Sequence, residues 1–154
     1  MVSSLDHIAK AETKAAQAYR GSVEAQRQAD AVVIPKLSER AEAVVVRLTM
    51  APDDAARAAV WRAMTADAAV AQEVAGFREA VRQRFGDDAV RAMMRSYGGT
   101  IETASVRPEH RAALGVVSRT VHVLSAGEFA RESQVRTERL AQRQALGRGL
   151  GLGR

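Results

Sequence analysis

Cysteine is absent from this 154-residue chain, proline occurs three times, and aromatic residues make up only 4% of it. Without cysteine the chain has no disulfide, no thiolate for a metal and no cysteine nucleophile, which is compatible with a reducing cytoplasm. Because aromatics are few, alanine, valine, leucine and methionine have to build the core. Small side chains in such a core let helix backbones approach one another closely.

Long apolar runs and secretion signals are also missing. No stretch approaches the roughly 20 apolar residues that a membrane-spanning helix needs. Residues 1–6 have neither the basic region nor the apolar run of a secretory signal. We therefore expect no membrane insertion.

The usual catalytic and cofactor-binding patterns are not found either. The three histidines, His7, His110 and His122, are not spaced with another ligand as in a helical zinc site. The acidic pairs 53–54 and 87–88 stand at expected helix starts, where carboxylates favour the positive end of the helix dipole. There is no Gly-x-Ser-x-Gly elbow and no phosphate-binding loop with its lysine. We expect no enzymatic activity, no metal and no cofactor.

Hydrophobic residues make up 47% of the chain, and their spacing is helical. The clearest apolar stripe, at spacings of four, three, four and four, comprises Val70, Val74, Phe77, Val81 and Phe85. Similar spacings and capping signals predict helices near residues 4–30, 37–48, 52–64, 67–85, 87–97 and from 108 onward. The predicted fold class is all-α.

Positive charge is gathered in the last third of the chain. Residues 1–106 carry fourteen basic and fourteen acidic side chains, whereas residues 107–154 carry nine arginines and four glutamates. After Glu138 no acid remains, while four arginines continue among four glycines: Arg139, Arg143, Arg148 and Arg154. We interpret residues 1–145 as a folded helical domain whose last helix projects into solvent. Residues 146–154 then form a flexible Gly/Arg tail that meets an acidic partner.

Charge alone leaves several partners open. Arginine pairs well with phosphate, so weak nonspecific nucleic-acid binding through the tail is one interpretation, as in a small helical DNA-binding accessory protein. The tail, however, has no aromatic side chain on which bases could stack. A solvated helix face explains the arginines that alternate with glutamates before residue 139. A helical oligomerisation module that uses Val135, Leu140 and Leu146 is another interpretation.

Residues 74–94, with the sequence VAGFREAVRQRFGDDAVRAMM, resemble part of a known family. Together with the all-α unit and the spaced arginines, they resemble the BID (Bep intracellular delivery) domain in the form found at the C-termini of alphaproteobacterial conjugative relaxases. The resemblance covers about residues 5–145. It implies an elongated antiparallel bundle of about four main helices with a short capping helix.

The same resemblance implies a non-catalytic secretion signal. Such a domain directs an attached protein, here a conjugative relaxase, from the cytoplasm of a donor bacterium into a recipient cell. Transport runs through a type IV secretion system, whose coupling ATPase is the implied partner. The arginines implied as the signal are Arg139, Arg143, Arg148 and Arg154.

Overall fold

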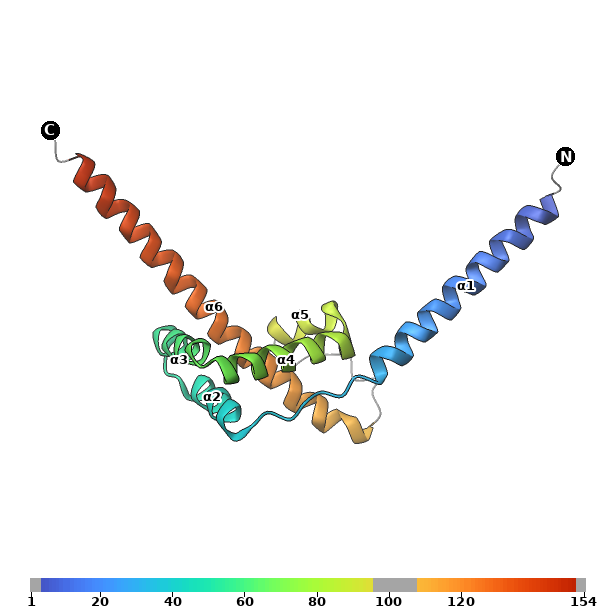
Figure 1. Ribbon diagram of the computed structural model, residues 1–154, viewed down its shortest axis with the longest axis horizontal. Helices are drawn as coiled ribbons and strands as arrows, with labels where there is room; N and C mark the ends of the chain where they lie inside the picture. Colours follow the sequence, from blue (N-terminus) through green and yellow to red (C-terminus); the bar gives the residue numbers. More distant parts are fainter. Residues whose placement is uncertain (1–3, 96–107, 152–154) are drawn as a thin grey trace.

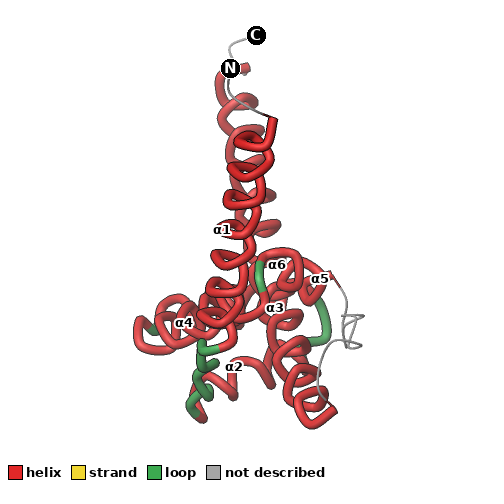
Figure 2. The backbone as a smooth tube through the Cα atoms, turned by 90° about the vertical axis from the view of Figure 1, so that its right-hand side faces the viewer, coloured by secondary structure: helices red, strands yellow, loops and turns green. Residues whose placement is uncertain are grey.

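The computed structural model describes residues 4–95 and 108–151, and within these ranges every regular element is an α-helix (Figures 1 and 2). The six described helices are α1 (Ser4–Asp30), α2 (Glu39–Met50), α3 (Asp54–Ala66), α4 (Ala68–Phe85), α5 (Asp87–Arg95) and α6 (Pro108–Gly151). This confirms the predicted all-α class, and each range predicted from the spacing has its counterpart. Tyr97, predicted for the end of the fifth helix, lies outside the described residues.

The helices form a central unit with two projecting arms (Figure 1). Helices α3 and α5 make the most extensive contacts with α6, and α2 contacts both α3 and α6. Helix α1 and the second half of α6 extend away from this unit in different directions. The body is therefore built around the first half of α6.

Side-chain caps fix where the helices begin. Ser38, Asp53 and Asp67 each accept a hydrogen bond from the backbone N–H three residues later. Pro52, predicted at the first helical position of α3, instead precedes the capping residue Asp53. A helix starting at Pro52 would have Ala51 as its cap, and alanine has no side-chain acceptor for the free N–H groups. Gly86 closes α4 with φ = 87°, a left-handed conformation that favours glycine.

The core lies where α2, α3, α4 and α5 meet α6. Its main residues are Ala41, Val44, Leu48, Trp61, Met64, Val70, Val74, Phe77, Val81, Met93, Leu114, Val121, Val123 and Leu124. The stripe predicted for α4 is thus confirmed, with Phe85 partly buried at its end. Met93 is buried, whereas Met94, predicted beside it in the core, is 41% exposed.

The inner face of α3 differs from the sequence prediction. The sequence predicts that Ala56, Val60, Ala63 and Met64 face inward and that Trp61 lies beside them as a core anchor. Trp61 and Met64 are buried as predicted, whereas Ala63 is exposed. The buried face of α3 is therefore rotated from the predicted face by about 100°, which is the angle between successive residues of a helix. Burying an indole removes far more apolar area from water than burying an alanine, so the tryptophan decides the rotation.

Helix α6 packs with a wider face than the predicted seam. The sequence predicts an inward seam of Leu114, Val117, Val121 and Leu124; Val117 is partly buried and the other three are buried. The further buried residues of this helix are Ser118, Val123, Ser125, Gly127 and Ala130. At Gly127 the backbone of α6 approaches its neighbours closely. A Cβ atom there would lie 2.8 Å from Leu48 Cδ2 and 3.2 Å from Trp61 Cε3. Because Gly127 has no side chain, α2 and α3 can pack close to the backbone of α6.

An extended strap, residues 31–38, runs between α1 and α2 and is tied to α4. The guanidinium of Arg84 donates to the carbonyl oxygens of Asp30 and Val32, and the N–H of Ser38 donates to Glu73 Oε2 at 2.8 Å. Ile34 and Leu37 pack against the core. The break predicted at Pro35 is confirmed, because the strap contains no helix.

Helix α1 stands away from the other helices (Figures 1 and 2). Every side chain from His7 to Gln28 is exposed, including Tyr19 at 72% and Ile8 at 54%. The apolar stripe predicted for this helix is therefore exposed; its residues are Ile8, Ala11, Ala15, Tyr19 and Val23. The elongated antiparallel bundle that the resemblance implies for about residues 5–145 stays a prediction.

Candidate functional site

The second half of α6 forms an exposed arm, residues 131–151. Among the described side chains the last buried one along the chain is that of Ala130, and every residue from Arg136 to Gly149 is exposed. This confirms that the last helix projects into solvent. Most residues of the arm are arginine, leucine, alanine, glutamine or glutamate, which are the best helix formers.

The structure continues α6 through Gly147 and Gly149 to Gly151. The sequence predicts fraying near Gly147 and a separate segment from residue 146. No boundary is visible at residue 146 in the described part of the chain, because α6 is one continuous helix there. Glycine is permitted in a helix at a cost of about 1 kcal/mol relative to alanine, so the glycines alone do not end it. The flexibility of the tail stays a prediction.

Three of the four predicted signal arginines lie on this arm. Arg139, Arg143 and Arg148 are exposed, and none of them forms an ion pair with a described residue. Arg154 lies outside the described residues. Arg139 and Arg143 are four residues apart and so share one side of the helix. Arg148 points to a different side at 100° per residue.

The arginines nearer the body do have partners. Arg131 donates to Gln134 Oε1 at 2.7 Å, and Arg136 donates to Ser133 Oγ at 3.1 Å. The guanidinium carbon of Arg136 also lies 5.9 Å from the centroid of the exposed Phe129 ring. Among the described arginines of the arm, those without a partner are therefore Arg139, Arg143 and Arg148.

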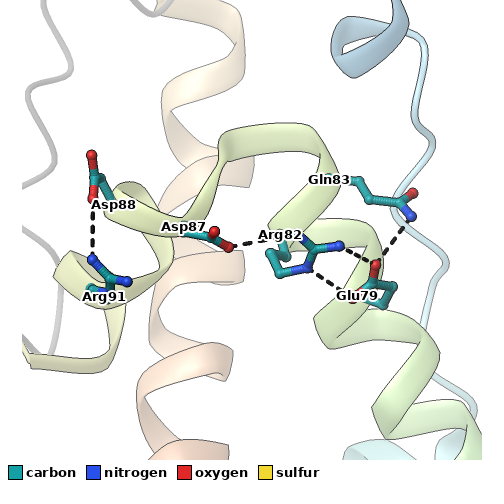
Figure 3. A network of polar contacts seen from close by, with 6 residues as sticks. All are labelled: Glu79, Arg82, Gln83, Asp87, Asp88 and Arg91. Carbon is teal, nitrogen blue, oxygen red and sulfur yellow. Dashed lines mark hydrogen bonds and ion pairs between the residues drawn. The ribbon is translucent and has the colours of Figure 1, made fainter.

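A polar network covers the junction of α4 and α5 (Figure 3). It comprises Glu79, Arg82, Gln83, Asp87, Asp88 and Arg91. The hydrogen bond from the Arg82 guanidinium is the main cause that lowers the pKa of Glu79, and the same hydrogen bond raises the pKa of Arg82. Arg82 also approaches Asp87 Oδ1 at 3.6 Å across the glycine turn. Arg82 thus contacts acids of both helices, Glu79 on α4 and Asp87 on α5.

A shallow groove of about 450 Å³ lies between α2 and α3. Its lining residues are Arg40, Ala43, Val44, Arg47, Ala59, Val60, Ala63, Met64, Asp67 and Val70. Arg40 pairs with Asp67. The groove is largely apolar and was missed by sequence reasoning, because its walls come from two helices whose packing is set by the fold.

The described histidines and acids are dispersed. His7 is exposed on α1, and His122 is half-buried with Nδ1 3.0 Å from the carbonyl oxygen of Met94. Asp53 caps α3, and Asp87 and Asp88 lie in the first turn of α5, as expected from their positions. Among the side chains that the structure describes, in residues 7–95 and 113–149, no group of three histidine, aspartate or glutamate residues is arranged to hold a metal ion. The exposed arm is the surface on which a function can be argued.

Comparison with known proteins found no significant match. No family model matches the chain, and neither a curated protein nor a solved structure is significantly similar to it. In the described part of the chain, no helix is both long and apolar enough to cross a membrane.

Proposed function

We propose that this chain is a non-catalytic delivery domain that directs an attached protein into a type IV secretion system. The observation that carries the proposal is the arm of α6, on which Arg139 and Arg143 are exposed and without an ion-pair partner in the described residues. The helical body acts as a rigid handle between this arm and the cargo. Its similarity in sequence to the BID domain at residues 74–94 supports the same function.

The partner in this proposal is the coupling ATPase of the secretion system. An acidic surface on the ATPase captures the arginines, and the capture weakens as salt rises because exposed charges are screened beyond about 8–10 Å. The cargo is a conjugative relaxase. The protein acts in the cytoplasm of the donor bacterium and then moves with its cargo into the recipient.

The proposal also includes one feature of the fold, which is the packing of α1. A BID domain is an elongated antiparallel bundle, and that arrangement requires α1 to pack against the other helices. In the proposal α1 does so in the full protein, and its stripe of Ile8, Ala15 and Tyr19 then faces the body.

The test replaces Arg143, Arg148 and Arg154 together by alanine in a reporter recombinase fused to residues 1–154. We expect transfer from a donor with type IV machinery to fall strongly, while the melting temperature stays unchanged because the described arginines of the arm are exposed. Unchanged transfer by the triple variant would contradict the role of the arginines.

Nucleic acid is the second candidate partner, because arginines without an ion-pair partner suit phosphates as well as carboxylates. A low-salt gel-shift titration with duplex DNA decides between the two. Binding that weakens steeply with salt and is lost on removal of residues 139–154 would favour a DNA-binding accessory protein. We expect weak binding that does not depend on DNA sequence.

A further inference from the structure

We infer that the partner recognises the arm of α6 as a helix, through one face that mixes arginines with apolar side chains. This inference rests on the proposed function and names the kind of surface that the receptor offers. The face binds in an acidic groove with an apolar floor on another protein. The alternative is capture of a flexible charged tail, in which every arginine counts equally.

The geometry of the helix defines the face. At 3.6 residues per turn, eight residues from 129 to 149 fall within one arc of about 120° on α6. We call six of them the Arg–Leu face: Phe129, Arg136, Arg139, Leu140, Arg143 and Leu146. Glu132 and Gly147 lie within the same arc. The Arg–Leu face contains all three large apolar side chains that α6 exposes from residue 129 to residue 149. The opposite side carries alanines and glutamines together with Arg131, Glu138 and Arg148.

The apolar members of the face are well exposed. Phe129 is 63% exposed, Leu140 57% and Leu146 69%. Arg136 lies over the Phe129 ring at 5.9 Å, so a cation and an aromatic ring already share one site on the face. These apolar side chains lie on the same side of the exposed helix, where a partner could contact them together with the arginines.

The positive charge of the Arg–Leu face favours an acidic groove on a protein as its binding partner. The arc carries three arginines and one acid, Glu132, so it keeps a net positive charge and a second copy packed face to face would bring like charges together. A helix that lies on a membrane separates its charges from its apolar residues, whereas here the two alternate on one side. Phosphates of DNA would leave the leucines without a partner. A groove that binds an amphipathic helix uses residues spaced as Arg136, Leu140 and Arg143 are.

Two arginines of the arm provide a matched pair. Arg143 lies on the Arg–Leu face and Arg148 lies outside it, yet both are exposed and neither forms an ion pair with a described residue. Replacing either one by alanine removes a single positive charge. A flexible tail predicts equal losses, and recognition of the face predicts unequal ones.

The experiment measures transfer of a reporter recombinase fused to residues 1–154. We expect Arg143→Ala and Leu140→Ala each to reduce transfer about tenfold, as for residues central to an interface, and Arg148→Ala to reduce it less than about twofold. Equal losses for Arg143→Ala and Arg148→Ala, or no loss for Leu140→Ala, would overturn the inference and leave the proposed function standing. Absence of transfer by the unaltered fusion would overturn both.

A second variant tests whether the partner needs a helix. Ala141→Pro keeps every charge, lies outside the Arg–Leu face and interrupts the helix at a cost of about 3 kcal/mol. We expect it to abolish transfer and to leave the melting temperature unchanged, because Ala141 is exposed beyond the last buried residue. Ala141→Ser is the matched control and should transfer normally. Transfer by Ala141→Pro at the level of this control contradicts recognition of a helix.

Discussion

Arg78 of α4 makes a two-pronged ion pair with Glu128 of α6, with Nη1–Oε2 at 2.7 Å and Nη2–Oε1 at 3.2 Å. The guanidinium carbon of Arg78 also lies 5.9 Å from the centroid of the Trp61 ring in α3. A single side chain therefore connects three helices at the edge of the core. The pair is half-buried, with Arg78 27% and Glu128 36% exposed, so water screens it only in part.

Replacing Arg78 should reduce stability through this contact. We expect Arg78→Lys to lower the free energy of unfolding by about 1 kcal/mol, because lysine cannot form the two parallel bonds or stack as well on the indole. Urea unfolding measures the effect, and Arg62→Ala, at an exposed arginine of α3, is the control and should change little. A loss of similar size in the control would show that the ion pair is not the cause.

Replacing Gly127 by alanine and replacing Gly76 by alanine should change the free energy of unfolding in opposite directions. Gly127→Ala should lower the free energy of unfolding by about 1–3 kcal/mol, since its methyl group meets the buried Leu48 and Trp61. Gly76→Ala, where a Cβ meets nothing within 4 Å, should raise it by about 0.5–1 kcal/mol through helix propensity alone. Thermal unfolding distinguishes the two, and a gain at both sites contradicts the packing described for α6.

Ser118 has a hydroxyl that is buried without a hydrogen-bond partner. Its replacement by alanine removes a polar group whose burial is unfavourable, so Ser118→Ala should raise the free energy of unfolding by about 1 kcal/mol. Ser133→Ala, at a helical serine that accepts a bond from Arg136, is the comparison and should be close to neutral. A decrease in stability for Ser118→Ala would indicate that its hydroxyl is satisfied in solution.

The lowered pKa of Glu79 predicts how stability depends on pH in acid solution. Because Arg82 lowers the pKa of this carboxyl in the folded state, its contribution to stability is full above the unfolded-state pKa, near 4.3. The contribution is lost as the pH falls through the lower folded value. Carboxyl titration by NMR should show the pKa of Glu79 rising in Arg82→Gln. An unchanged titration curve in that variant would mean that Arg82 does not form the contact.

Local features of the fold were predictable from single stretches of sequence. The stripe from Val70 to Phe85 determines α4 by its own spacing, and Gly86 and Asp67 mark the ends of that helix by their conformational and hydrogen-bonding properties. The exposed end of α6 was predicted for the same reason, because apolar residues become sparse after Phe129. These signals depend on near neighbours in the chain.

Features that depend on packing were not predictable in this way. Arg78 and Glu128 are 50 residues apart, and no local pattern pairs them. The rotation that buries Trp61 depends on the helices that surround α3. The groove between α2 and α3 also exists only once the two helices meet. The Arg–Leu face is different, since the spacing of Arg136, Leu140 and Arg143 could have revealed it on a helical projection.

The most direct test of the proposed function is transfer of a reporter recombinase fused to residues 1–154. The assay compares a donor that has type IV machinery with a donor that lacks it, beside a fusion ending at Glu138. We expect transfer only with the machinery and only with the complete arm. Transfer that is absent with the machinery, or equal without it, would contradict a delivery function.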